Sequence, residues 1–194
     1  MEIIMKLKRL IVAFFMLICW NPKTIFAKSP PVPAVQFPFD VSRSDTTLNQ
    51  EFQIRDARSY VFAIKFDYVG PVDKKRVRTM VGGGGRYPDG RYGEPGVIVP
   101  IHITICKLNP GQAPESVYDG LFETQGCYAN GFERNQNNGH LDREIVTIDL
   151  QPGIYRVEAN TIKDSQEFSG TPSQLLIEFH PNIKFLPKSK RGAI

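Results

Sequence analysis

The sequence predicts an all-β protein, an antiparallel sandwich or barrel of about eight strands. Apolar and polar residues alternate in one segment after another, which is the two-residue period of a strand that covers a core. Clusters of Gly, Pro and Asn separate these segments, as turns would. No stretch of about 12 residues carries the apolar stripe of an amphipathic helix.

The N-terminus has the three-part layout of a secretory signal peptide. A basic segment comes first, the apolar run Ile11–Trp20 follows, and the small residue Ala27 stands at the expected cleavage site. The run has 10 residues, whereas a membrane-spanning helix needs roughly 20. We therefore expect residues 1–27 to be removed, leaving a periplasmic or secreted protein with no transmembrane span. Lipidation at Cys19 stays open, although Ile18 is a poor match to the small residue that such a site needs.

Loss of the signal peptide changes the charge balance. The full chain has 24 basic and 20 acidic residues, and residues 28–194 keep 20 and 19 of them, a net charge of +1. A nucleic-acid-binding domain needs a basic face, and this balance gives no support for one. The remaining length suits one domain with a sizeable core.

Along the mature chain we expect a Pro-rich leader over residues 28–34, a sandwich domain over 35–186 and a basic tail over 187–194. The strongest predicted strand is Ser59–Val69, which places five large apolar residues on one face: Tyr60, Phe62, Ile64, Phe66 and Tyr68.

Further strands are predicted by the same alternation. The clear ones are Val97–Cys106, Glu144–Leu150, Ile154–Thr161 and Leu175–Phe179, and the weaker ones are Val35–Val41, Glu51–Arg55, Arg76–Val81 and Leu121–Tyr128.

Two cysteines, Cys106 and Cys127, remain after processing. An even number of cysteines in an oxidising compartment favours one disulfide, and the alternative is a pair of buried thiols. A bridge that closes a loop of roughly 20 residues would stabilise the fold by about 3 kcal/mol.

The Gly-rich segment Gly82–Gly93 is the most distinctive loop. It cannot be a phosphate-binding loop, because Arg91 and Tyr92 replace the Lys and Ser/Thr of that motif. It is either a flexible crossover between strands or a recognition loop. In the second case Arg86, Tyr87, Arg91 and Tyr92 supply the residue types that dominate binding hot spots. Tyr118, in the expected loop Asn109–Tyr128, either packs beneath that loop or joins the binding surface.

No motif for catalysis or metal binding is present. The chain lacks a nucleophile elbow, a zinc-binding His or Cys motif and a complete calcium loop. The three histidines, His102, His140 and His180, stand in a strand, a turn and a strand end. We therefore expect a protein that is not an enzyme and that needs no cofactor or metal.

The segment Leu150–Tyr155 resembles the tyrosine corner of immunoglobulin-like and fibronectin-type-III-like sandwiches. In that motif the chain crosses from one sheet to the other, and the tyrosine hydroxyl bonds to upstream backbone. The resemblance implies such a fold, with a structural corner made by Leu150, Pro152, Gly153 and Tyr155.

The whole layout resembles an uncharacterised family of small exported bacterial proteins, catalogued as a domain of unknown function. The resembling elements are the signal peptide, the strands Tyr60–Tyr68 and Val97–Ile105, the Val81-Gly82 exit and the Leu150–Tyr155 corner. Some exported sandwiches of this kind act as antitoxins for envelope toxins.

These features together predict an exported, non-enzymatic binding module of the bacterial envelope that recognises another protein. Its most concrete version is an antitoxin-like immunity protein. The alternative is a carbohydrate- or cell-wall-binding module that uses Tyr87, Tyr92 and Tyr118. A hydrolase with an unrecognised site and a structural pilus subunit also stay open.

Overall fold

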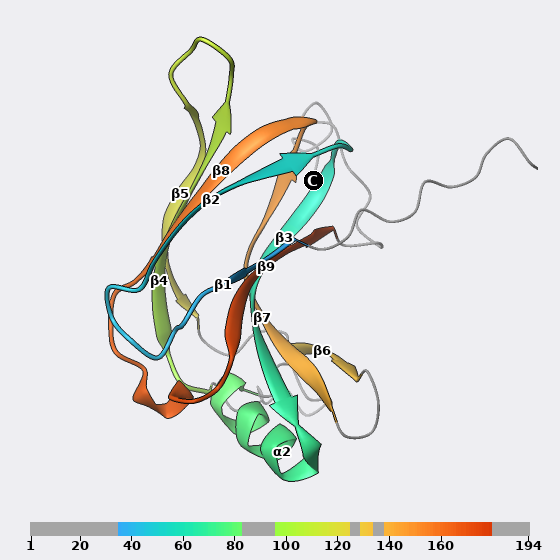
Figure 1. Cartoon of the computed structure of the whole chain (residues 1–194), viewed down its shortest axis with the longest axis vertical. Coiled ribbons are helices and arrows are strands. Elements are labelled where there is room, and N and C mark those ends of the chain that lie inside the picture. Colours follow the sequence, from blue (N-terminus) through green and yellow to red (C-terminus); the bar gives the residue numbers. More distant parts are fainter. Residues whose placement is uncertain (1–34, 83–95, 125–128, 134–137, 180–194) are drawn as a thin grey trace, which may run out of the picture. The chain divides into compact units, whose positions relative to one another are not determined.

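The computed structural model describes residues 35–82, 96–124, 129–133 and 138–179, all within the unit Pro33–Ile194. In these residues two antiparallel sheets pack face to face (Figure 1). One sheet has five strands in the order β1-β9-β3-β7-β6, and the other has four in the order β2-β8-β4-β5. The predicted all-β antiparallel sandwich is therefore confirmed. The elements are β1 Val35–Pro38, β2 Thr47–Ile54, β3 Arg58–Val69, α2 Gly70–Val81, β4 Val99–Leu108, β5 Glu115–Thr124, β6 Ala129–Glu133, β7 Asn138–Leu150, β8 Gly153–Thr161, the 3-10 turn η2 Gln166–Phe168 and β9 Ser173–Phe179.

The strand pairing follows one nested pattern. β1 pairs with β9, β2 with β8, β3 with β7, and β4 with β5. The chain is thus one long antiparallel hairpin, with its tip at the β4–β5 turn, wrapped around a core. This nesting is the jelly-roll arrangement, to which β6 adds an edge strand beside β7.

The immunoglobulin-like strand order implied by the corner motif is not the one found. An immunoglobulin sandwich has seven strands in the sheets ABED and CFG, so that its first two strands are neighbours. Here β1 and β2 lie in different sheets. A corner motif fixes one crossover between sheets, and it carries no information about which distant strands pair.

The corner itself has the expected geometry. Leu150 ends β7 in one sheet and Gly153 begins β8 in the other. The Tyr155 hydroxyl donates a hydrogen bond to the carbonyl oxygen of Gln151 at 2.8 Å and accepts one from its N–H at 3.2 Å. Tyr155 is buried, and this burial raises the pKa of its hydroxyl. These two hydrogen bonds therefore hold the crossover between the sheets from inside the core.

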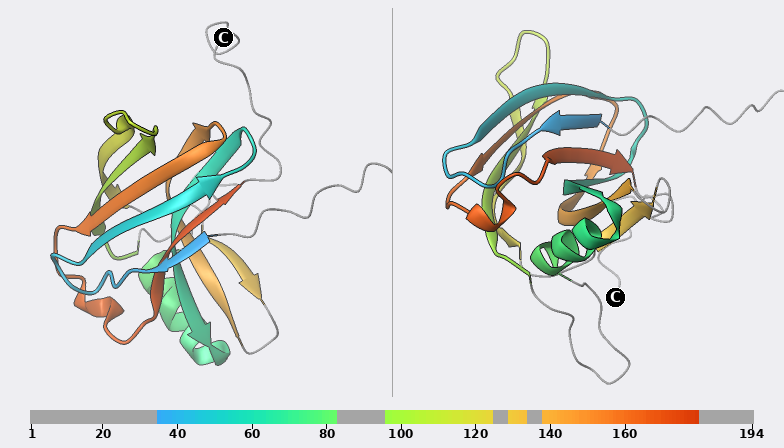
Figure 2. Two further views of the ribbon diagram at one scale, coloured as in Figure 1. Left: turned by 45° about the horizontal axis from the view of Figure 1, so that its top comes forward. Right: turned by 60° about the horizontal axis from the view of Figure 1, so that its bottom comes forward.

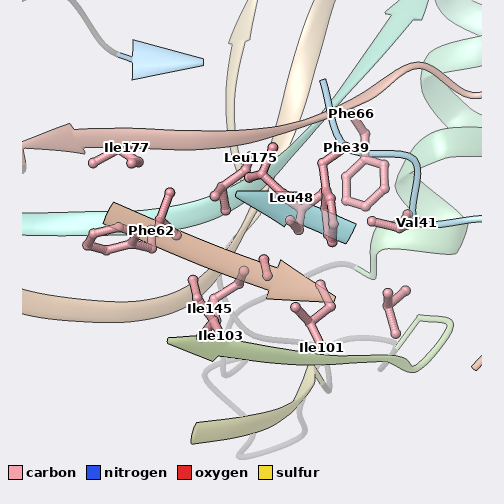
Figure 3. Packing of buried hydrophobic residues seen from close by; sticks show 14 of the residues in the cluster. Phe39, Val41, Leu48, Phe62, Phe66, Ile101, Ile103, Ile145, Leu175 and Ile177 are labelled. Atoms are coloured by element: carbon pink, nitrogen blue, oxygen red, sulfur yellow. The ribbon is translucent and has the colours of Figure 1, made fainter. Parts of the chain in front are cut away.

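The core lies between the sheets and is filled from both (Figure 3). The five residues predicted as the core face of β3 are all buried. Phe52 of β2 connects the two layers, since its ring contacts Phe62 edge-on at 6.1 Å between centroids and stacks on Tyr155 at 5.8 Å. At one end Phe168 of η2 stacks on Phe66 at 4.7 Å. Such contacts add about 0.5–1.5 kcal/mol each to the burial of the rings.

The segment Arg76–Val81, predicted as a weak strand, is the second half of the helix α2, which contacts β3 and β7 (Figure 2). Pro71 occupies its first turn, and the Asp73 carboxylate accepts the N–H of Val69 at 2.9 Å. Gly82, with φ of 91°, ends the helix. Only Val77, Met80 and Val81 are buried on it. Three buried apolar positions in 12 residues, all in the second half of the helix, are too few to give a visible stripe.

The expected loop Asn109–Tyr128 contains the ten-residue strand β5. Acidic residues and Gly120 interrupt the alternation of apolar and polar residues along β5, so the strand is hard to see in the sequence. Such residues are tolerated there because β5 is an edge strand that faces solvent on one side. The strand β6 was not predicted, and β7 begins at Asn138 rather than at Glu144.

The corner yields a first prediction. Replacing Tyr155 by Phe removes two hydrogen bonds from a buried hydroxyl without changing the ring. The free energy of unfolding, measured in urea, should fall by about 1–3 kcal/mol. Tyr118→Phe, which removes the hydroxyl of a half-buried tyrosine outside the corner, is the matched control and should change it by less than about 0.5 kcal/mol. Equal losses in the two variants would show that the corner has no special contribution.

Candidate functional site

The four loop residues predicted to bind a partner, Arg86, Tyr87, Arg91 and Tyr92, lie outside the described residues. The residues on either side of that loop are described, and they end at Gly82 and resume at Gly96. The described part of the site is therefore the base of this loop.

A buried arginine holds this base together. Arg143 lies on β7 with 2% of its surface exposed. Its Nε donates a hydrogen bond to the Val81 carbonyl oxygen at 3.0 Å, and Nη2 donates to Met80 at 3.0 Å and also contacts Val81. Its Nη1 donates to the Val97 carbonyl at 2.6 Å. One guanidinium thus joins the end of α2 to Val97, two residues before β4 begins.

The position of Arg143 explains how a charge is accommodated in the interior. Burying an isolated cation is costly unless hydrogen bonds replace its hydration. Here the guanidinium meets the last carbonyls of α2, where the helix dipole is negative and favours a cation. Three carbonyl groups in different directions suit the planar fork of Arg, and a Lys ammonium could not reach all of them.

Gly96 completes the base. Its φ is +70°, and a side-chain Cβ there would lie 2.5 Å from the Met80 oxygen and 2.6 Å from Arg143 Nη2. The N–H of the next residue, Val97, donates to the Met80 carbonyl at 2.7 Å. Only glycine fits this conformation and this space. The backbone is therefore held in place at Gly82 and again at Gly96 and Val97.

The other predicted site residues lie elsewhere. Tyr118 is half-buried on β5 and packs against the core, with its hydroxyl so close to Gly120 that a Cβ there would lie 2.7 Å away. Cys106 is a free cysteine of intermediate exposure on β4, and Cys127 lies outside the described residues.

The two described histidines, His102 and His140, fall on the outer faces of the sheets, and His140, predicted in a turn, lies in β7. His102 pairs with Asp119 at 2.8 Å on the four-stranded sheet. His140 pairs with Asp142 at 3.4 Å on the five-stranded sheet, and it lines a pocket of about 390 Å³ there. His180 is beyond the described residues. In the described part of the chain, no three His, Cys, Asp or Glu side chains are grouped so as to hold a metal ion.

Sequence reasoning missed Arg143 and this outer pocket. One signal was available in the sequence, because Arg143 stands midway between Leu141 and Ile145, at a position that the two-residue alternation assigns to the core face. An arginine among alternating apolar residues indicates a buried charge with a structural or functional task. The pocket had no such signal, since its residues come from three strands, β1, β3 and β7, which come together only in the fold.

Comparison with known proteins places the chain in a family. A family model described as a domain of unknown function (DUF5625) matches residues 36–179. The chain belongs to the DUF5625 family. The matched residues of this DUF5625 domain run from β1 to the end of β9, so they include Arg143, Gly96 and the outer pocket.

Two solved structures are similar to this DUF5625 domain. A crystal structure of a protein from Sulfurospirillum deleyianum is 24% identical with a TM-score of 0.63, and the match covers 77% of this chain and 99% of that one. This likeness shows the fold alone. The structure of infectious bursal disease virus Gx strain is 8% identical with a TM-score of 0.27, covering 79% of this chain and 31% of that one, and no argument rests on it. No curated protein matches the sequence. Among the described helices, none is long and apolar enough to cross a membrane.

The base of the loop yields a second prediction. Gly96→Ala forces both a positive φ and a steric clash, so the free energy of unfolding should fall by about 2–4 kcal/mol. Gly111→Ala is the matched control, because Gly111 has φ of +72° and nothing within 4 Å of an added Cβ. That variant carries the conformational cost alone and should lose about 1 kcal/mol. Chemical denaturation of both variants measures the difference, and its absence would mean that the clash is relieved by local movement.

Proposed function

We propose that this DUF5625 domain is an exported, non-enzymatic binding module of the bacterial envelope that recognises another protein through the loop of residues 83–95. The observation that carries the proposal is the buried Arg143 with its hydrogen bonds to Met80, Val81 and Val97, which fastens the chain on both sides of that loop. A recognition loop needs fixed ends, because ordering it on binding costs free energy that preorganisation avoids.

The helix that leads into the loop indicates the charge of the partner. Asp73, the single acid in α2, is bonded to Arg76 at 2.7 Å. Lys75 and Arg78 are exposed on the same helix. Val72 is 83% exposed at its start. A basic helix with an apolar tip beside a loop that contains Arg86 and Arg91 suits a partner with an acidic face.

An antitoxin-like immunity protein, which covers the active face of an envelope toxin, is the most specific form of this proposal. The alternative, a carbohydrate- or cell-wall-binding module built on Tyr87, Tyr92 and Tyr118, is less well supported. Tyr118 is half-buried against the core, so its ring faces are used in packing rather than offered to a sugar. Tyr87 and Tyr92 lie outside the described residues.

Affinity capture from envelope extract tests the proposal. Protein purified from cells that express the full chain is the bait, and mass spectrometry identifies what it retains. A second bait carries alanine at Arg86, Tyr87, Arg91 and Tyr92. We expect one stoichiometric protein that the first bait retains and the second loses. A partner retained equally by both baits, or no partner at all, would contradict recognition through this loop.

The charge of α2 yields a third prediction. Lys75→Glu should weaken binding of the captured partner by about tenfold at low salt, mainly through a slower association rate, and 0.5 M salt should remove most of the difference. Arg55→Glu is the matched control. Arg55 is also exposed, but it precedes β3, whereas α2 follows the other end of that strand. Surface plasmon resonance of the two variants measures both rates, and equal effects would indicate a response to net charge rather than to this surface.

A further inference from the structure

We propose that the free edge of β2 is a dimerisation surface, at which a second copy of this chain adds its own β2 antiparallel to the first, across a two-fold axis. β2 forms one edge of the four-stranded sheet, and within the described residues it pairs only with β8 (Figure 1). Pairing of this kind would join the four-stranded sheets of two copies into one continuous sheet. The surface belongs to a different element from the loop of residues 83–95 and does not depend on it.

The four described sheet edges are not alike. An exposed edge strand invites pairing with another chain, and proteins usually prevent this with short strands, prolines, charges or bulges. β1 has four residues and ends in Pro38, and β6 has five residues. β5 contains a bulge, because Tyr118 and Ser116 pair with consecutive residues of β4. β2, in contrast, has eight residues, an unbroken register with β8 and no Pro, Gly, Lys or Arg. Among these edges it is the one left open to strand addition.

The hydrogen bonds at the start of β2 show which backbone groups face away from β8. The Thr46 carbonyl oxygen accepts the N–H of Thr161 at 3.1 Å, so the backbone of Thr46 faces β8. The N–H and C=O of one residue point to the same side of a strand, and the side alternates along it. The residues of β2 whose backbone groups point outward are therefore Thr47, Asn49, Glu51 and Gln53, and no described strand lies beside them on that side.

These outward groups are self-complementary in one register. In an antiparallel pair centred on Gln50, Thr47 lies opposite Gln53 of the second copy, and Asn49 lies opposite Glu51. All four outward residues of each copy then exchange N–H and C=O groups with the other copy. Centring the pair on Asn49 leaves Gln53 beyond the end of the other β2, and centring it on Glu51 does the same to Thr47.

The charges favour the same register. Glu51 is the single charged residue of β2, and like charges directly opposite each other destabilise a pair of strands. In the register centred on Gln50 it lies opposite the neutral Asn49, whereas centring on Glu51 would bring two acids together. Each Glu51 also keeps its ion pair with Arg156 of its own sheet, at 3.1 Å.

Gln50 itself indicates that the occupant is a second copy. It has the phase of the buried Leu48 and Phe52, yet it is exposed. A monomeric sandwich commonly places a charge at such an inward position of an edge strand to prevent pairing. Here the residue is neutral, and its carboxamide both donates and accepts hydrogen bonds, so two copies of Gln50 are complementary where they meet on the two-fold axis.

Sedimentation velocity of protein purified from cells that express the full chain, between about 1 and 300 μM, tests the proposal. We expect a monomer–dimer equilibrium within this range. Gln50→Lys and Gln50→Glu each place like charges opposite each other, so each variant alone should dimerise about tenfold more weakly or worse. An equal mixture of the two should associate at least as well as the wild type, because an ammonium then faces a carboxylate. Gln53→Lys is the matched control. Gln53 is also exposed on β2, but it would lie opposite Thr47, so the affinity should stay within about twofold.

Several results would overturn the proposal. They are a monomer at every concentration, a dimer that Gln50→Lys does not weaken, and a mixture of the two Gln50 variants that stays monomeric although circular dichroism shows both to be folded. If the Gln50 variants do not fold, Asn49→Pro removes one outward N–H and no hydrogen bond to β8, so it should abolish the dimer and keep the fold. Dimerisation of Asn49→Pro at the wild-type concentration would exclude this edge as the interface.

The loop proposal is tested separately. Alanine at Arg86, Tyr87, Arg91 and Tyr92 should leave the dimer unchanged, and Gln50→Lys should leave capture of the envelope partner unchanged. Either proposal can therefore fail without the other.

Discussion

The buried guanidinium of Arg143 is the interaction on which the rest of this sandwich depends. The helix α2 and the chain that follows it must carry the polypeptide from β3 in one sheet to β4 in the other. Such a crossover has few apolar residues of its own, and the helix buries only three. Arg143 holds the crossover in place where apolar packing is insufficient. Its one side chain donates hydrogen bonds to the last carbonyl groups of the helix and to the carbonyl group of Val97. Because it is charged, it cannot be left without these partners, so the crossover has one stable arrangement.

Much of the fold was predictable because strand periodicity is a local signal. The alternation in β3 identified its core face correctly, down to Tyr60 and Tyr68 at its ends. The sheet order was not predictable, because nested pairing joins residues such as Val35 and Ile177, and nothing in a local pattern selects that partner. The helix α2 was not predicted from the sequence, for a related reason. Its stability comes from Pro71, from Asp73 at its start and from Arg143 far along the chain, rather than from an apolar stripe.

For the candidate sites, too, the local features were visible in the sequence and the contacts between distant residues were not. The Gly-rich loop was visible in the sequence as composition, yet its base depends on Arg143, which is 61 residues from Gly82. The outer pocket could not be found from the sequence, since Asp67 and His140 have no distinguishing pattern until the register brings them together. Asp142 and Arg143 are consecutive on β7 and face opposite sides of the sheet. On this one strand His140 lines the outer pocket, and Arg143 holds the base of the loop from the core side.

The nested pairing has a consequence for how the chain could be rearranged. Because β1 lies antiparallel to β9, Val35 is the strand partner of Ile177, and among the described residues the start of the first strand lies beside the end of the last. The tip of the hairpin, at the Asn109–Gly111 turn, lies farthest along the chain from both ends and is exposed. Joining the ends with a short linker and opening the chain at this turn would preserve every strand pair while reversing the order in which the halves are synthesised. This architecture therefore permits circular permutation, because the final structure does not depend on the order in which the two halves are synthesised.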